Sequence, residues 1–151
     1  MSDETAGNEI ENRFGYLLKH VQSRYQQLAG AALEQLGIDG KQWAVLVTIG
    51  SGEELSQQEA ANALGIDRTT MVALVDGLED KGLARRSRHP EDRRKNIVEL
   101  TTDGRRTLER ARKKVAAAEQ TFFAPLSSPD IDKFKTALRA LLRGDEQGRY
   151  E

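Results

Sequence analysis

Six positive side chains lie close together in the middle of the chain: Arg85, Arg86, Arg88, Arg93, Arg94 and Lys95. Like charges at this density repel one another when they are alone. They suit a surface that meets a polyanion, either opposite phosphates or with one guanidinium inserted into a narrow, negative minor groove. Asp92 is placed to orient Arg94 or Arg86 through a bidentate carboxylate–guanidinium pair.

The net charge of the whole chain hides this concentration. The 151 residues carry 23 Lys and Arg against 24 Asp and Glu, a formal charge of −1. Residues 81–114 hold 13 basic and 5 acidic residues, a balance of +8, which leaves −9 for the rest. This asymmetry predicts one face that binds a polyanion on an otherwise acidic body. A solvated, charged helix would explain the same counts, so charge alone leaves both readings open.

Composition argues against several kinds of site. The chain has no cysteine, which excludes disulfides, thiolate metal sites and a thiol redox switch. The only histidines, His20 and His89, lie far apart, so a dedicated transition-metal site is not expected. The sequence has no glycine-rich phosphate loop, and its carboxylates are scattered over amphipathic segments. We therefore expect no cofactor, no metal and no enzymatic activity.

The same composition bounds the size and location of the protein. It is 38% hydrophobic and 31% charged, which describes a soluble globular chain of one domain, here residues 1–151. No apolar run approaches the ~20 residues of a membrane span. Residues 1–10 are acidic and polar, unlike a signal peptide. We expect a cytoplasmic protein without a membrane partner.

The first half of the chain reads as a series of helices. Apolar residues at steps of three and four predict one long amphipathic helix from Ile10 to about residue 36. Gly37 ends it, and Asp39 caps a second helix that stops at residues 50–52. Ser56 and Glu59 form a capping-box pattern that opens a short helix reaching residue 64.

The turn after this short helix predicts a helix-turn-helix motif. Gly65 and the N-cap Asp67 separate the short helix from another over residues 68–81, and about three connecting residues with a glycine are typical of this motif. One face of the second helix is apolar and must be buried. The opposite face is small and mixed, with nothing to block entry into a major groove about 12 Å wide. The candidate DNA-binding residues in this region are Ser56, Gln57, Arg68, Thr69, Thr70 and Ala73.

A hairpin and two helices complete the predicted fold. Residues 83–88 and 96–100 read as short strands around a charged loop opened by Pro90, so that Arg86, Arg93, Arg94 and Lys95 join the DNA-binding candidates. Thr101 or Thr102 caps a long helix that Pro125 ends, and Ser128 with Pro129 starts the last one. Gly144 onward is expected to fray. The predicted fold class is mainly α with a small β-hairpin wing.

These residues resemble one known family. Residues 56–81, then Gly-Leu-Ala-Arg-Arg at 82–86, His-Pro-Glu-Asp-Arg-Arg at 89–94 and Val-Glu-Leu-Thr at 98–101, are similar to the MarR family of bacterial regulators. The resemblance implies a winged helix-turn-helix at 39–101 and dimerisation helices at 10–36 and 102–143. It also implies that the helix at 68–81 reads the major groove, that Arg94 enters the minor groove, and that Asp92 holds this arginine.

Function follows from the resemblance as an expectation. The chain would be a homodimeric transcriptional regulator that binds double-stranded DNA with a pseudo-palindromic operator, and repression is the simplest mode. Many relatives release DNA when a small aromatic or lipophilic acid binds. A phenolic or lipophilic effector would then contact Tyr16, His20 and Trp43, with Arg86 facing its carboxylate. Two alternatives remain: a regulator without an effector, and a winged-helix module that binds another protein.

Overall fold

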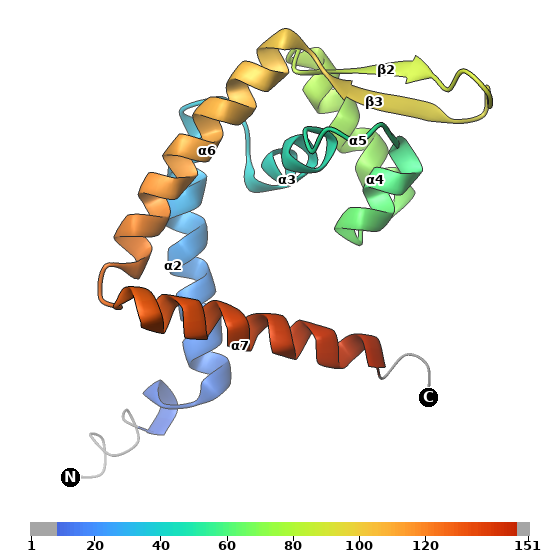
Figure 1. Ribbon diagram of the computed structural model, residues 1–151. Helices are drawn as coiled ribbons and strands as arrows, with labels where there is room; N and C mark the ends of the chain where they lie inside the picture. The colour runs from blue at the N-terminus through green and yellow to red at the C-terminus, as the bar shows by residue number, and fades with distance from the viewer. Residues whose placement is uncertain (1–8, 148–151) are drawn as a thin grey trace.

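The computed structural model describes residues 9–147 and has two parts (Figure 1). A winged-helix head holds α3 (Gly40–Ile49), β1 (Leu55–Ser56), α4 (Gln57–Leu64), α5 (Arg68–Asp80), β2 (Ala84–Arg88) and β3 (Asn96–Leu100). Three long helices form the other part: α2 (Phe14–Glu34), α6 (Thr102–Phe123) and α7 (Ser128–Gln147). The expected fold class, mainly helical with a β-hairpin wing, is confirmed.

Short polar residues start the helices of the head, as the sequence predicts. Asp39 and Ser56 each form a complete capping box, in which the side chain accepts from the N3 backbone N–H and the N3 side chain returns the bond. Asp67 and Thr101 cap α5 and α6 in the simpler way. Because each cap satisfies a free N–H of the first turn, these residues fix where the helices begin.

The core of the head lies where α3, α4 and α5 meet the sheet. Its largest fully buried side chains include Leu46 on α3 and Met71, Val75 and Leu78 on α5. Ala60 and Ala61 of α4 are also buried, and their small side chains allow α4 and α5 to pack closely. Gly65 joins these two helices with a φ of 65°, a left-handed conformation that favours glycine.

The sheet has three antiparallel strands in the order β1-β3-β2. The hairpin of β2 and β3 was expected and pairs Ala84 with Leu100 through to Arg88 with Asn96. The two-residue strand β1 was not expected, because Leu55 and Ser56 are too few to show a period. β1 pairs with β3 through Leu55 and Val98, which attaches the start of α4 to the root of the wing.

The long helices differ from the prediction at their ends. The helix is interrupted at residues 12–13, so α2 starts at Phe14 rather than Ile10. Arg13 is the N-cap of α2 and has an extended conformation. The N-cap of α7 is Ser127 rather than the expected Ser128, since the Ser127 hydroxyl accepts from the backbone N–H of Asp130. The expected fraying at Gly144 is wrong as far as residue 147, because α7 continues to that point. Residues 148–151 lie outside the described part.

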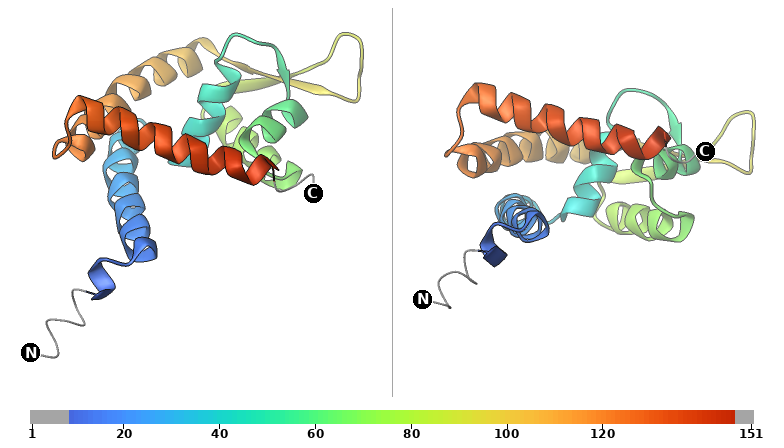
Figure 2. Two further views of the ribbon diagram at one scale, coloured as in Figure 1. Left: turned by 60° about the horizontal axis from the view of Figure 1, so that its bottom comes forward. Right: turned by 90° about the horizontal axis from the view of Figure 1, so that it is seen from below.

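The helices α2 and α6 pack along each other, whereas α7 crosses them and packs only lightly on its own chain (Figure 2). Tyr25 of α2 donates a hydrogen bond to Glu119 of α6 at 3.1 Å and meets the ring of Phe122 edge-on. Burial is the main cause that raises the pKa of Tyr25, and the bond to Glu119 raises it further.

Large apolar side chains remain exposed on these long helices. Among the described residues, twelve large hydrophobics are exposed, and eleven lie before Gln22 or after Phe123. Leu141 and Leu142 are 67% and 73% exposed, and Phe14 is 70% exposed. An apolar surface of this extent is typical of a face that meets another protein surface. No helix in the described range is both long and apolar enough to cross a membrane.

Candidate nucleic-acid interface

Helix α5 is held by its buried face and presents its other face to solvent. Met71, Val75 and Leu78 anchor it in the core, while Arg68, Thr69 and Ala73 are exposed and Thr70 is half-buried. The carboxylate of Asp67 accepts from the backbone N–H of Thr70 at 2.6 Å. Hydrogen bonding to Thr70 holds the pKa of Asp67 below its ordinary value, so the cap is charged at neutral pH.

The loop between β2 and β3 is shaped by its own polar groups. The ring of His89 accepts from the backbone N–H groups of Glu91 and Asp92 at 3.1 and 3.2 Å. The carboxylate of Asp92 accepts from the backbone N–H of Arg94 at 3.0 Å. Asp92 therefore positions the backbone of Arg94, and in the described chain it forms no ion pair with the guanidinium of Arg94 or Arg86.

A polar hollow of about 210 Å³ collects the basic residues of the wing and of α5. Arg94 and Lys95 of the hairpin loop line it together with Arg68 at the start of α5. The remaining wall is the start of α4, Ser56 to Gln58, and Asn96. Three cations around one small hollow beside a helix N-terminus can hold a phosphate. Five of the ten predicted DNA-binding residues meet here: Ser56, Gln57, Arg68, Arg94 and Lys95.

The other predicted residues lie around this hollow or turn away from it. Thr69, Thr70 and Ala73 continue along α5, and Arg93 is exposed on the loop. Ser56 and Gln57 are buried, at 6% and 9% exposure, because Ser56 caps α4 and Gln57 accepts from Arg86. Their backbones are therefore better placed than their side chains to meet a phosphate.

Arg86 is held inside the protein rather than presented to solvent. Its guanidinium pairs with Asp76 at 2.6 Å and with Glu79, both on α5. It also donates to the Val72 carbonyl at 3.1 Å and to the Gln57 side chain at 2.8 Å. The side chain of Arg86 is only 20% exposed. The sequence did not indicate this network, because its members lie on three elements.

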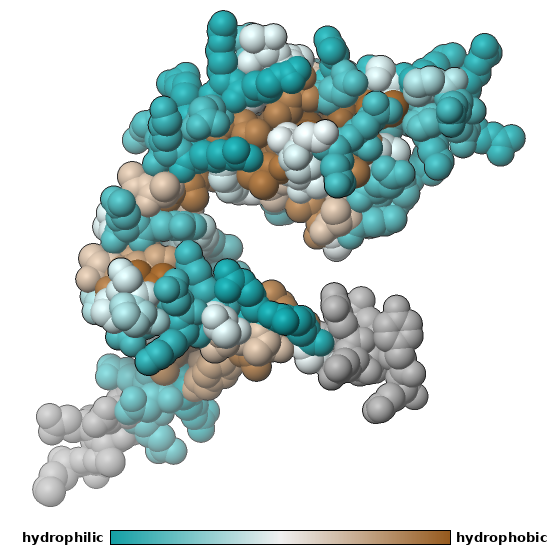
Figure 3. Space-filling view, in the orientation of Figure 1, coloured by the Kyte–Doolittle hydropathy of each residue, from teal (hydrophilic) through white to brown (hydrophobic). Residues whose placement is uncertain are grey.

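The positive charge is distributed over two parts of the structure. Seven of the thirteen basic residues in 81–114 lie in 81–95, and six lie on α6, which leads away from the wing (Figure 1). In Figure 3 the loop end of the hairpin is hydrophilic, while apolar patches show in the middle of the head and along the lower edge of α7. The basic face is therefore smaller than the sequence suggested and centres on the wing.

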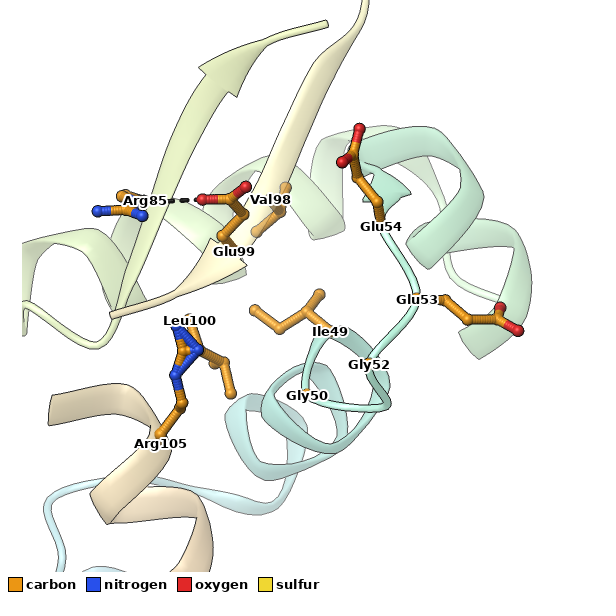
Figure 4. A pocket seen from close by; sticks show the side chains of 10 residues that line it. All are labelled: Ile49, Gly50, Gly52, Glu53, Glu54, Arg85, Val98, Glu99, Leu100 and Arg105. Atoms are coloured by element: carbon orange, nitrogen blue, oxygen red, sulfur yellow. Dashed lines mark hydrogen bonds and ion pairs between the residues drawn. The ribbon is translucent and has the colours of Figure 1, made fainter. Parts of the chain in front are cut away.

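The opposite side of the hairpin carries mixed charge. A hollow of about 370 Å³ there is lined by Arg85 and Arg105 and by three glutamates, Glu53, Glu54 and Glu99 (Figure 4). Arg85 pairs with Glu99 across the strands at 3.1 Å. Neighbouring residues of β2 thus point to opposite faces, and the acidic groups make this side unsuited to DNA.

Comparison with known proteins identifies the family. The model of the MarR family matches residues 36–95. The transcriptional repressor CouR bound to a 23-mer DNA duplex superposes with a TM-score of 0.83 at 34% identity, over 89% of this chain and 95% of CouR. The chain belongs to the MarR family. It is a DNA-binding transcriptional regulator with a winged helix-turn-helix.

Two further relatives agree with this assignment to the MarR family. A transcriptional regulatory protein proposed for the hcr operon of Thauera aromatica is 29% identical over 145 residues, 95% of this chain and 87% of the relative. CouR from Rhodococcus jostii RHA1 bound to p-coumaroyl-CoA has a TM-score of 0.77 and 28% identity, over 87% of this chain and 93% of CouR. These relatives are regulators rather than enzymes, in agreement with the expectation from composition.

The four predicted effector residues of this MarR protein are not brought together within one chain. Trp43 lines a hollow of about 590 Å³ between α2, α3 and α6. Tyr16 and His20 stack on each other at 4.1 Å on the N-terminal half of α2, outside this hollow. Arg86 faces α5 instead. Tyr25 and Lys41 also line the hollow but were not predicted from the sequence as effector residues, because only the packing of α2 against α3 brings them together.

Proposed function

We propose that this MarR protein is a homodimeric repressor that reads a pseudo-palindromic operator and is released by a small aromatic or lipophilic acid. The observation that carries the DNA-reading part is the hollow where Arg68, Arg94 and Lys95 meet the start of α4. In this arrangement α5 enters the major groove with Thr69, Thr70 and Ala73 toward the bases. Arg94 and its neighbours on the loop reach the adjacent minor groove and phosphates.

The homodimer is proposed from the exposed apolar residues of the long helices. Leu141 and Leu142 of α7 and Phe14 and Leu17 of α2 would be buried by a second copy, at roughly 25 cal/mol for each Å² of apolar area removed from water. α2, α6 and α7 therefore serve as dimerisation helices, and residues 39–101 form the reading head. Two heads related by a two-fold axis require half-sites about one helical turn, ~10 bp, apart.

The experiment is a fluorescence anisotropy titration of the intergenic DNA beside the protein's own gene across a salt series. We expect two chains per binding site and a log–log salt slope of about −0.9 for each phosphate neutralised. A scrambled duplex of the same length should bind more weakly. Equal, weak binding to both duplexes would instead favour the alternative of a winged-helix module that binds a protein partner.

Repression is proposed because it needs nothing beyond tight binding at a promoter. The relative with the TM-score of 0.83 is itself named a transcriptional repressor. A reporter gene placed behind the bound intergenic segment tests this mode. Its expression should rise when the gene for this protein is deleted, and a fall would identify an activator.

The effector is proposed to bind in the hollow between α2, α3 and α6. Its volume suits a small ligand, and Tyr25, Leu33, Trp43 and Val115 give it an aromatic and aliphatic wall. Lys41 lines the same hollow and supplies the positive charge that an acid needs. The binding of p-coumaroyl-CoA by CouR supports a phenolic class of ligand.

Replacing Gly30 with leucine tests the hollow without removing a contact. Gly30 lines the hollow, and no atom lies within 4 Å of a Cβ built at this position. A leucine there would occupy the space of the ligand. We expect Gly30→Leu to bind DNA as the parent does and to lose release by p-coumarate or octanoate, measured by anisotropy.

Gly15→Leu is the matched control, since Gly15 also has open space but lies at the other end of α2. If Gly30→Leu responds to the acids as the parent does, the hollow is not the effector site. If the parent itself responds to neither acid, the alternative of a regulator without an effector of this class is favoured.

A further inference from the structure

Arg86 connects three elements that take part in DNA reading. It lies on β2 of the wing and donates to α5 through Val72, Asp76 and Glu79. Its Nε donates to the side chain of Gln57, in the first turn of α4. In the described part of the chain, no other side chain links the wing to both helices of the motif through hydrogen bonds.

The hydrogen bonds of Arg86 leave little for DNA. A guanidinium has five N–H donors, and four of them are used by Gln57, Asp76, Glu79 and Val72. Two carboxylates beside one guanidinium also give the group an excess of negative charge. A phosphate would therefore meet repulsion here rather than a free cation.

The neighbouring residue shows what an ordinary wing arginine does. Arg85 points to the opposite face of the sheet, pairs with Glu99 on the next strand and has a side chain that is 63% exposed. That pair joins two strands of one hairpin that the backbone already holds. The network of Arg86 joins the hairpin to a separate helix, so it constrains the angle between them.

We propose that Arg86 is a positioning residue that fixes the angle between the wing and α5 and thereby sets the discrimination between operator and unrelated DNA. Sequence discrimination requires base contacts from α5 and groove contacts from the wing in the same complex. Non-specific attraction depends on charge and tolerates a change of angle. The inference rests on the DNA-reading face proposed above, and it replaces a direct contact of Arg86 with DNA or with an effector.

The test uses variants for which an effect of charge and an effect of wing position predict opposite changes in operator affinity. Asp76→Asn combined with Glu79→Gln removes two negative charges beside the reading face, so charge alone predicts tighter binding to all DNA. Loss of the network predicts the reverse for the operator. We expect this variant to bind the intergenic operator about tenfold more weakly and the scrambled duplex at least as tightly as the parent.

Arg86→Met is the second variant. If Arg86 is a positioning residue, this variant should bind the operator more weakly than the parent. Its affinity for the scrambled duplex should stay within about twofold of the parent's, and its salt slope should not change. If Arg86 instead contacts a phosphate of DNA, its loss should weaken binding to both duplexes equally and reduce the magnitude of the salt slope by about 0.9. Arg85→Met and Asp80→Asn, which change a charge on the same strand and the same helix, are the controls and should keep the parent's discrimination.

Three outcomes would overturn the proposal: equal losses on both duplexes, a shallower salt slope, or an operator affinity that is kept or increased in the carboxamide variant. The carboxamide variant keeps the proposal testable if Arg86→Met does not fold, because both of its substitutions are nearly isosteric. Arg94→Ala in the same titration reports on the reading face itself. If Arg94→Ala binds as the parent does, the proposed face is wrong, whatever Arg86 does.

Discussion

Replacing Arg94 with alanine is expected to weaken operator binding by about 10- to 100-fold, equivalent to about 1–3 kcal/mol, while the protein stays folded. Arg94 lines the hollow between the wing, α4 and α5, and its backbone is held there by Asp92. In the described chain its side chain has no hydrogen bond or ion pair that folding depends on, and it is exposed. Anisotropy titration measures the affinity, and circular dichroism follows the fold.

Arg143→Ala is the matched control for this loss of one charge. Arg143 is an exposed arginine on α7, far from the wing along the chain. The control should keep the operator affinity of the parent, and its salt slope should be unchanged. If the two alanine variants bind the operator equally well, the wing does not contact DNA through Arg94.

Gly104→Ala is expected to destabilise the fold by about 1–3 kcal/mol or more. Gly104 lies in the first turn of α6 and packs against the root of the wing, where an added Cβ would overlap the Leu83 carbonyl oxygen. That oxygen also accepts from the backbone N–H of Thr101, so it cannot move without losing this bond. Thermal unfolding followed by circular dichroism measures the change, seen as a lower Tm.

Gly144→Ala is the control for the intrinsic effect of a helical glycine. No atom lies within 4 Å of a Cβ built on Gly144, which is in the last part of α7. Alanine there should raise stability by up to about 1 kcal/mol, because glycine has more conformational freedom to lose. If Gly104→Ala is also neutral or stabilising, α6 and the wing root are less closely packed than the structure has them.

The parts of the fold predicted well from the sequence are those set by local chemistry. Ser56 with Glu59, Asp67, and Thr101 each form caps within four residues, so their sequence pattern is also their structural cause. Gly37, Gly65 and Gly82 likewise end helices with positive φ values. Local patterns of this kind predicted the helices from α2 to α7 and the hairpin of β2 and β3, in their order along the chain.

The parts that could not be predicted depend on contacts between distant residues. β1 exists only because β3 lies beside it, and Arg86 is bound by residues up to 29 positions away. Trp43 and Tyr25 share a hollow because α2 packs against α3. Tyr16 lies nine residues before Tyr25 and therefore on the opposite side of α2, outside this hollow. The break before Phe14 also escaped prediction, since the apolar spacing continues through it.

Lys81 links the end of α5 to residues in the wall of the hollow between α2, α3 and α6. At the end of α5 its ammonium donates to the Gly37 carbonyl and, at 2.9 Å, to Gln42, whose side chain also accepts from the backbone N–H of Asp39. Asp39, Gly40 and Lys41, between these anchor points, line the hollow. The 13 residues of α5 span about 20 Å. A displacement of about 1 Å at Lys81 therefore tilts α5 by roughly 3° about its capped end.

Such a tilt would couple the hollow to the DNA-facing side of α5 in both directions. A molecule that spreads the wall of the hollow would move the Lys81 end of α5, and DNA that holds α5 in its groove would resist that movement. Thermodynamic linkage makes the two effects equal in free energy. If a small acid bound in the hollow lowers the affinity for DNA, bound DNA therefore lowers the affinity for the acid by the same factor.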